Sequence, residues 1–271
     1  MRRRGRGLPD PPELPAAARP PWPVWYAPVA LVAAFGAITA ASVPLIPLVI
    51  FLFISDTLAA LALLVLLLVQ DGVLVGAALL FAGFTRRPRP WHFGLRATRL
   101  WPTVGWAALG FLMLLGIELG YIWLLDVEET NVEDIGGAST LAAFLVALAV
   151  IVVAPVAEEL FFRGFFYRAL RTKLRVWSAA LIDGLVFGAL HFQGLDSAVI
   201  LPVIAAVGIG LCLVYERTGS LFAVIAIHAA FNTVATLGIA PLPAILVGLA
   251  MIAACVLVPR MAGPGPSPMP T

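Results

Sequence analysis

The sequence predicts an all-α fold: a polytopic transmembrane helical bundle with about eight spans. Hydrophobic residues make up 62% of the 271 residues and charged residues only 12%, whereas soluble domains carry about 25% charged residues. Apolar runs close to the roughly 20 residues that cross a bilayer recur along the chain. The cationic residues gather in a few connections between these runs, as in membrane proteins of fixed orientation. A soluble globular domain is therefore excluded.

Eight candidate spans follow from the apolar runs. They cover 25–54, 57–84, 101–125, 140–173, 176–194, 198–215, 221–237 and 241–258. Pro44 and Pro47 are expected to kink the first span, because proline interrupts the helical hydrogen-bond ladder. The fourth run would measure about 50 Å as one helix, against about 30 Å for the hydrocarbon core, so we expect it to tilt or to extend into the cytoplasm.

The two ends of the chain differ from its middle. Residues 1–23 are rich in arginine and proline and are predicted to form a disordered basic arm. Residues 259–271 are predicted to form a disordered tail, which leaves 24–258 as the membrane domain. The first apolar run is too long for a signal peptide, so we expect an uncleaved span. Tryptophans near the span edges are expected to anchor the domain at the interface; they are Trp22, Trp25, Trp91, Trp101 and Trp177.

Charge distribution predicts the orientation of the spans. The connections 85–100 and 171–175 are basic, whereas the connection 126–139 is acidic. An even number of spans with both termini in the cytoplasm places the basic connections inside and the acidic one outside. This pattern is typical of membrane topology and does not indicate nucleic-acid binding. We expect the protein to lie in a bacterial inner membrane.

The fourth span contains the segment Glu158-Glu159-Leu160-Phe161-Phe162-Arg163, where charges interrupt an apolar run. Ionisable residues inside a membrane are costly and usually mark a functional site. Glu159 and Arg163 are four residues apart, so they share one helix face and can pair. Glu158 is turned away from that face, which leaves it free to accept a proton. The alternative is a buried ion-pair cluster that only fixes helix packing.

Two histidines lie in apolar runs after this segment. A helical hairpin turning near Leu174 and Arg175 would place Glu158 and His191 at the same depth. Phe187 lies one turn before His191 and would wall the same pocket. His228 and Asn232 share one face of the seventh span. By contrast, His92 is expected to be solvated or interfacial.

These three motifs resemble the CAAX protease and bacteriocin-processing (CPBP, or Abi) family of intramembrane proteases, which includes the type II CAAX prenyl endopeptidase. The resemblance covers about 140 to 237, and the segment Phe93-Gly94-Leu95-Arg96 also looks like a feature of the family. It implies an endopeptidase in which Glu158, helped by His191, activates a water. His228 and Asn232 would stabilise the oxyanion, and Glu159, Arg163 and Phe187 would support them. A conical catalytic cavity is expected among spans four, five and seven.

Several alternatives remain open from the sequence. No cofactor is expected, because the ligand spacing differs from that of a zinc protease with two histidines on one helix turn. The alternative is Zn²⁺ held by Glu158, His191 and His228. A proton-coupled transporter and a non-catalytic membrane scaffold are the alternatives of another class. The expected partners are a peptide or protein substrate at the membrane and the lipid bilayer.

Other residues in apolar runs receive structural interpretations. Asp183 is expected to pair with Arg163 or Arg168, whereas Glu118 and Asp71 either line the cavity or pair. The glycines 208 and 210 are expected to allow close helix packing. The cysteines 212 and 255 are expected to be small core residues rather than a disulfide or a metal site.

Overall fold

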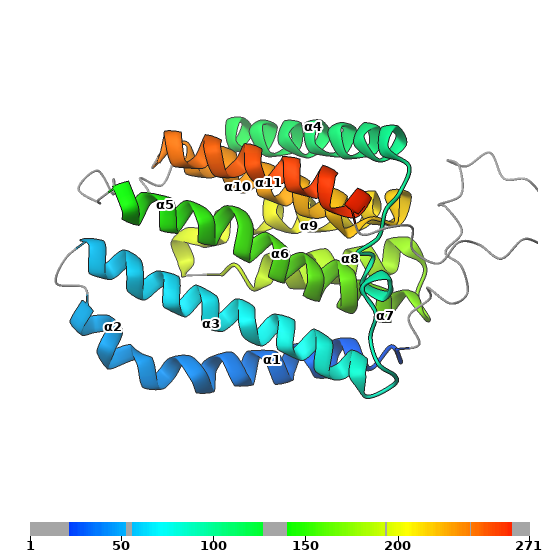
Figure 1. The fold of residues 1–271 in the computed structure, drawn as a ribbon, viewed down its shortest axis with the longest axis horizontal. Coiled ribbons are helices and arrows are strands. Elements are labelled where there is room, and N and C mark those ends of the chain that lie inside the picture. The colour runs from blue at the N-terminus through cyan, green and yellow to red at the C-terminus, as the bar shows by residue number, and fades with distance from the viewer. Residues whose placement is uncertain (1–21, 53–55, 127–139, 193, 239, 262–271) are drawn as a thin grey trace, which may run out of the picture.

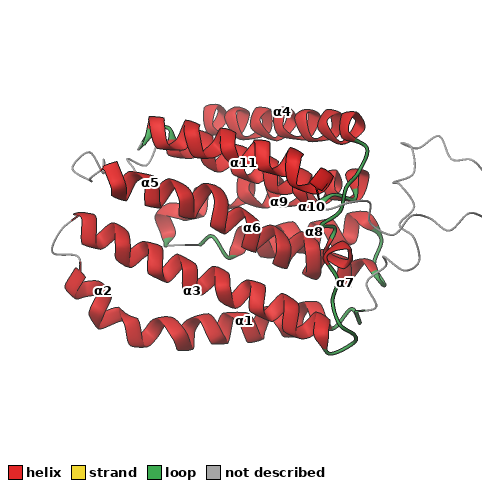
Figure 2. Cartoon of the chain, viewed as in Figure 1, coloured by secondary structure: helices red, strands yellow, loops and turns green. Residues whose placement is uncertain are grey.

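The computed structural model describes residues 22–52, 56–126, 140–192, 194–238 and 240–261 as a bundle of helices lying side by side (Figures 1 and 2). The described part contains no strand, which confirms the predicted all-α class. In chain order its elements are α1 (Tyr26–Ser42), η2 (Val43–Leu45), α2 (Ile46–Leu52), α3 (Asp56–Gly83), η3 (Pro90–Phe93), α4 (Leu100–Leu125), α5 (Thr140–Leu148), η4 (Ala149–Val153), α6 (Ala154–Glu159), η5 (Leu160–Tyr167), α7 (Arg168–Arg171), α8 (Val176–Ala189), η6 (Leu195–Val199), α9 (Leu201–Thr218), α10 (Leu221–Thr236) and α11 (Pro241–Met261).

Within the described residues, six helical runs are long and apolar enough to cross a membrane. The remaining two predicted spans are the shorter apolar helices α8 and α10, of 14 and 16 residues. As predicted, the first run is interrupted at its prolines: α1 ends at Ser42, a 3-10 turn contains Pro44, and α2 follows. The predicted arm 1–23 and tail 259–271 lie largely outside the described residues. The last three residues of α11 belong to that predicted tail, so the helix runs beyond the predicted domain end.

The basic connections gather at one end of the bundle. Figure 1 shows that α1 begins and α11 ends at the same end, on the right of the view, where the chain between α3 and α4 and the turn between α7 and α8 also lie. Helix α4 ends and α5 begins at the opposite end. This arrangement agrees with the predicted separation of basic and acidic connections. Which end faces the cytoplasm stays a prediction.

The fourth span is one helical run of 32 residues, Thr140–Arg171, in which two π-helical segments flank α6. The first of them, η4, immediately precedes α6, whose second residue is Pro155. Proline has no N–H to donate to the carbonyl four residues earlier, so it relaxes the α-helical ladder at this point. The second, η5, holds Arg163. π-Helical turns inside α-helices are frequent at functional sites, and these two bracket the adjacent glutamates.

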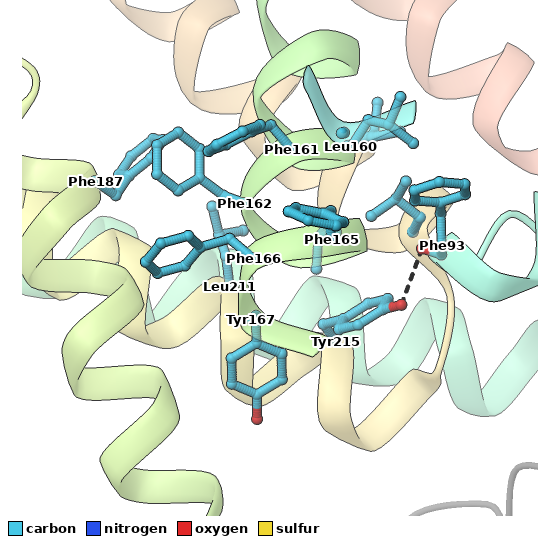
Figure 3. Close-up of a cluster of buried hydrophobic side chains, with 14 of the residues drawn as sticks. Phe93, Leu160, Phe161, Phe162, Phe165, Phe166, Tyr167, Phe187, Leu211 and Tyr215 are labelled. Carbon is cyan, nitrogen blue, oxygen red and sulfur yellow. Dashed lines mark hydrogen bonds between the residues drawn. The ribbon is translucent and has the colours of Figure 1, made fainter. Parts of the chain in front are cut away.

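Aromatic side chains bury η5 in the centre of the bundle. All eight residues of η5 are buried. Figure 3 shows its phenylalanines packed between Phe187 on one side and Phe93 and Tyr215 on the other. Trp22 is only 1% exposed and its ring lies 5.0 Å from that of Phe93. The expectation that Trp22 is an interfacial anchor at the end of the arm is therefore wrong, because this residue fills the aromatic core.

Residues 93–96, the segment that resembles a feature of the CAAX protease family, attach the basic connection 85–100 to the bundle. The hydroxyl of Tyr215 donates to the carbonyl of Phe93 over 2.9 Å (Figure 3). Gly94 has a φ of 88°, a left-handed conformation that favours glycine, and its carbonyl accepts the N–H of Leu221. Arg96 donates to the carbonyl of Gly219 over 2.9 Å. These contacts fix the start of α10, which carries His228.

His92 belongs to the same buried connection, so the expectation of a solvated or interfacial histidine is wrong. The residue is 3% exposed, and its ring lies 2.8 Å from Nη2 of Arg86 and 3.0 Å from the backbone nitrogen of Arg89. Its carbonyl accepts a hydrogen bond from Arg168. These contacts hold the ring of His92 inside a folded 3-10 turn. The charged residues around His92 in the sequence do not reveal that it is buried.

Small residues bring α8 and α9 into close contact. A Cβ added at Gly208 would lie 2.8 Å from the Cα of Gly184, and one at Gly188 would lie 2.8 Å from the Cβ of Ala205. A Cβ added at Gly210 would lie 2.5 Å from Leu114 of α4. The structure thus confirms the packing role predicted for the glycines 208 and 210. Cys212 and Cys255 are free and buried, as predicted.

We expect Gly184→Ala to lower the free energy of unfolding by at least the cost of overpacking, which is about 1–3 kcal/mol. The new Cβ would meet backbone atoms of α9 at 2.6 and 2.7 Å, and backbone cannot rotate away. Gly120→Ala in α4 is the matched control, because no atom lies within 4 Å of its added Cβ. Thermal unfolding in one detergent compares the two. Equal melting temperatures for both variants would contradict the close packing of α8 on α9.

Candidate active site

A buried ion-pair network forms the base of the site. Nη1 of Arg163 donates to Oε1 of Glu159 over 2.7 Å, and its Nε lies 3.4 Å from Oδ1 of Asp183. All three side chains are fully buried. Nη2 of Arg163 donates to the carbonyl of Gly208 over 3.0 Å, which the close packing of α8 and α9 makes possible. The predicted pairings of Arg163 with Glu159 and with Asp183 are both confirmed.

His228 of α10 connects this network to Glu158. Its Nδ1 lies 2.8 Å from Oε1 of Glu159, and its Nε2 lies 3.9 Å from Oε2 of Glu158. Because the carboxylate of Glu159 accepts, Nδ1 carries a proton, and Nε2 is the nitrogen on the Glu158 side. The side chain of Glu158 is 13% exposed and that of Glu159 is 0% exposed. The adjacent glutamates therefore differ in environment: Glu159 is sealed in a salt bridge, and Glu158 is not.

The Glu158 carboxylate has spare hydrogen-bonding capacity. Its Oε2 has no hydrogen-bond partner among the described residues, and 3.9 Å to His228 is too long for a hydrogen bond. A buried polar atom without a partner is costly in a folded protein. Such an atom beside a fixed histidine is suited to hold a water or a substrate group.

Phe187 lies between the two histidines, as the prediction of a pocket wall requires. Its ring centroid is 4.7 Å from that of His191 and 5.8 Å from that of His228. The guanidinium carbon of Arg163 lies 4.4 Å from the same ring, within the range of a cation–π interaction. Phe187 thus contacts both sides of the site and restricts the position of each.

His191 lies in the turn that follows α8 and not inside a helix. The predicted span 176–194 is wrong at this end, because α8 ends at Ala189. Nδ1 of His191 lies 2.8 Å from the carbonyl of Phe187. This contact gives a hydrogen-bond partner to a carbonyl near the end of α8, where carbonyls have no partner within the helix. Among the described residues, no hydrogen bond or ion pair joins Glu158 to His191, and Phe187 lies between His191 and His228.

Asn232 lies one turn after His228 on α10, on the predicted face. Its Nδ2 donates to the carbonyl of Val150 in η4 over 2.7 Å. The amide therefore ties α10 to the π-helical segment that precedes Glu158. Both π-helical segments of the fourth span therefore take part in the site: η4 contacts Asn232, and η5 supplies Arg163.

The sequence left two roles open for Asp71, lining the cavity or pairing. Asp71 of α3 is 2% exposed, and neither of its carboxyl oxygens has a hydrogen-bond partner in the described part of the chain. Helix α3, which carries Asp71, packs against α6, the helix of Glu158. The available signal was that Asp71 is the single charge in the run 57–84.

The donor set does not form a metal-ligand cluster. No three side chains of His, Cys, Asp or Glu are gathered for a metal ion in the part of the chain that the structure describes. Nδ1 of His228 and Nδ1 of His191 both lie at hydrogen-bond distance from protein oxygens, which leaves the Nε2 atoms as the ring nitrogens that could bind a ligand. The arrangement of Glu158, His191 and His228 therefore does not fit the compact three-ligand set of a catalytic zinc site.

The structure also contains an apolar cavity of about 260 Å³ between α4, α10 and α11. Its lining includes Phe111, Phe222, Ile227 and Cys255. It includes none of the predicted catalytic residues, so it is not the conical cavity expected among spans four, five and seven. That cavity stays a prediction.

Comparison with known proteins identifies the segment that holds the site. Residues 140–234 match the family described as type II CAAX prenyl endopeptidase Rce1-like. An uncharacterized protein of Bacillus subtilis, YpbD, is 37% identical over 78 residues, which cover 29% of this chain and 37% of that relative. The match therefore spans little more than a third of the relative's length. No solved structure gives a significant match. The resemblance predicted from the three motifs is confirmed for residues 140–234, which match the Rce1-like, type II CAAX prenyl endopeptidase family and hold Glu158, His191, His228 and Asn232.

Proposed function

We propose that this protein is an intramembrane endopeptidase that hydrolyses a peptide bond of a membrane-associated or lipidated peptide or small protein. The observation that carries the proposal is the difference between the adjacent glutamates. Glu159 is neutralised by Arg163 and fully buried, whereas Glu158 retains an unpartnered carboxylate oxygen beside His228. A carboxylate in this state can act as a general base.

In the proposed reaction Glu158 takes a proton from a water, whose oxygen attacks the carbonyl carbon of the scissile bond. The carbonyl π electrons move onto its oxygen and form an oxyanion. When the oxyanion collapses, the C–N bond breaks, and Glu158 returns the proton to the leaving amine. The products are a new carboxyl terminus and a new amino terminus, and Glu158 is regenerated.

His228 and Asn232 are proposed to stabilise the oxyanion. Glu159 holds Nδ1 of His228, so a protonated His228 would present Nε2–H on the side of Glu158. The second N–H of the Asn232 amide can serve as another donor, because the first one is engaged by Val150. Preorganised donors of this kind are worth about 3–4 kcal/mol each in other hydrolases. His191, which Phe187 separates from His228, is proposed to orient the water or the substrate carbonyl.

The experiment that tests the function is hydrolysis of a library of membrane peptides by the purified protein. The same residues would support a transporter only if they changed their access between the two sides of the membrane.

We propose that the protein lies in a bacterial inner membrane with both termini in the cytoplasm. The basic connections gathered at one end of the bundle support this location.

We propose that no metal is needed, and expect hydrolysis by the detergent-purified protein to survive exhaustive dialysis against a strong chelator. The reason is that Glu158, His191 and His228 are not gathered as a group of three ligands among the described residues. The measurement is the initial rate before and after dialysis, with a known zinc protease as the control. Loss of activity followed by recovery on adding stoichiometric Zn²⁺ would establish the zinc alternative with Glu158, His191 and His228.

A further inference from the structure

We propose that the apolar cavity between α4, α10 and α11 is a lipid site: it binds one acyl chain of an anionic bilayer phospholipid, whose phosphate meets Arg99 at the basic end of the bundle. The site is separate from the catalytic residues, because it lies behind α10. The proposal concerns lipid binding and does not depend on peptide hydrolysis.

The cavity exists because the side chains around it are small. It encloses about 260 Å³, whereas protein interiors leave few voids larger than a water molecule. Empty space of this kind costs packing energy, so an apolar ligand that fills it stabilises the bundle. One third of the lining residues are alanines: Ala97, Ala107, Ala108, Ala223, Ala226 and Ala230.

The cavity is as long as one leaflet of a bilayer. Leu100 at the start of α4 and Phe111 farther along it both line the cavity, and an α-helix covers about 16 Å over that interval. Half of the hydrocarbon core measures about 15 Å. On α10 the lining begins at Ser220, beside the same connection, where the N–H of Leu221 donates to the carbonyl of Gly94. An acyl chain that enters from the basic end therefore fits along both helices.

The polarity of the lining changes along the cavity. Its three hydroxyl groups belong to Thr98, Thr103 and Ser220, which lie at or just before the starts of α4 and α10. The deeper lining contains only apolar side chains and the thiol of Cys255. A lining that is polar at one end and apolar beyond it matches the glycerol ester and the acyl chain of a phospholipid.

The connection 85–100 supplies positive charge at the polar end. It contains five arginines and no acidic residue. Arg96 donates to the carbonyl of Gly219, the residue before the lining residue Ser220. Arg99 is exposed and lies in the chain between the lining residues Thr98 and Leu100. Arginine is suited to bind phosphate, and basic segments beside a membrane span attract anionic lipids.

The cavity is open toward the bilayer. Val104 of α4 and Ile252 of α11 both line it, and each is 37% exposed. Both helices also pack against α10, which forms the back of the cavity. The lining is therefore continuous with the outer surface of α4 and α11, so an acyl chain can enter sideways from the bilayer.

The position behind α10 favours a bilayer lipid over the lipid group of a substrate. With a turn of about 100° per residue, the lining positions of α10 are centred on the face opposite His228 and Asn232. On its other side α10 packs against η4 and α6, which lead to Glu158. A chain in the cavity supports the helix that carries His228 without reaching the catalytic residues. The lining positions are Phe222, Ala223, Ala226, Ile227 and Ala230.

The direct test is photo-crosslinking of the full-length wild-type protein in phosphatidylcholine vesicles. The probe is phosphatidylglycerol with a diazirine in the middle of one acyl chain, and mass spectrometry maps the adducts. We expect adducts on the lining residues Ala226, Ile227 or Ala230 of α10. Adducts confined to outward-facing positions, such as Leu112 of α4, which is 64% exposed, would overturn the proposal.

The headgroup test compares lipids and arginine variants. Phosphatidylcholine with the same diazirine chain should give about fivefold fewer cavity adducts than phosphatidylglycerol, as expected for one arginine beside an anionic lipid. Arg99→Gln should lower the phosphatidylglycerol adducts to the phosphatidylcholine level. Arg87→Gln is the matched control, because Arg87 is exposed in the same connection but is not next to a lining residue. Equal labelling by the two lipids, or equal effects of the two variants, would overturn the role of Arg99.

A cavity-filling variant tests the acyl-chain site by a second measurement. Saturating phosphatidylglycerol should raise the melting temperature of the wild type in detergent by about 2 °C or more. Ala107→Phe fills the cavity and should abolish both this shift and the α10 adducts. Ala33→Phe is the matched control, because Ala33 is exposed on α1 and does not line the cavity. A shift retained by Ala107→Phe would contradict the site.

Competition identifies the occupant. Excess unlabelled phosphatidylglycerol should remove the cavity adducts of the wild type. If a palmitoylated peptide removes them and phosphatidylglycerol does not, the cavity belongs to a lipidated substrate and the proposal is overturned. The wild-type adduct map and this competition decide the proposal even where Ala107→Phe does not fold.

Discussion

Glu158→Gln is expected to reduce peptide hydrolysis by about 10²–10⁴-fold, the range typical of losing a general base. Glutamine keeps the size and shape of the side chain but cannot take a proton from water. The fold should be retained, because Glu158 is outside the salt bridge that holds Arg163. The measurement is kcat/KM for one cleaved peptide, together with the melting temperature of each variant.

Glu158→Asp provides the matched control. It keeps a carboxylate but withdraws it by one methylene, so we expect activity between those of the wild type and Glu158→Gln. Glu118→Gln tests whether the loss of any acid within a span lowers activity. Glu158→Gln activity within threefold of wild type would reject Glu158 as the base.

Arg163→Ala is expected to have the largest effect on stability. Its guanidinium is fully buried and contacts Glu159, Asp183 and the carbonyl of Gly208. Removing one partner of a buried ion pair costs about 3–5 kcal/mol, because the other charge is stranded. Here two carboxylates would be stranded, so expression and melting temperature should fall along with activity.

Combined variants resolve the network. The double variant Glu159→Gln with Arg163→Met removes one pair but leaves Asp183 without its arginine, so it should recover only part of the lost stability. Adding Asp183→Asn should recover more, since no lone charge remains. Activity need not return, because Glu159 also holds Nδ1 of His228. The comparison is made by thermal unfolding in one detergent. If Arg163→Ala melts like the wild type while activity vanishes, Arg163 is better explained as a substrate-binding residue.

Local spacing made part of this site predictable. The four-residue interval between Glu159 and Arg163 gave their pairing, and the hairpin between the fourth and fifth spans brought Asp183 close to Arg163. The apolar runs gave the helices, because burial in lipid demands continuous helices with satisfied backbone groups. Phe187 was placed correctly because positions one turn apart share a face.

Contacts between distant segments were not predictable from spacing. The position of His191 beyond the end of α8 depends on where the helix stops, and an apolar sequence does not mark that point. Trp22 was expected at the membrane interface because it lies at the edge of a predicted span. His92 was expected to be solvated or interfacial because it lies in a basic connection, yet both residues pack inside the fold. The π-helical turns around α6 shift side-chain directions within a run that has one continuous apolar pattern. The packing of α3, which carries Asp71, on α6 is likewise a contact between distant segments.

The measurement that tests the central claim most directly is cleavage of a membrane-peptide library by the purified protein in H₂¹⁸O, with products analysed by mass spectrometry. We predict defined cleavage sites whose new carboxyl termini carry ¹⁸O in the wild type, and no such products above background in Glu158→Gln. Absence of labelled products from a folded wild-type protein across the library would contradict the claim that this site hydrolyses peptide bonds, as would equal product formation by the two proteins.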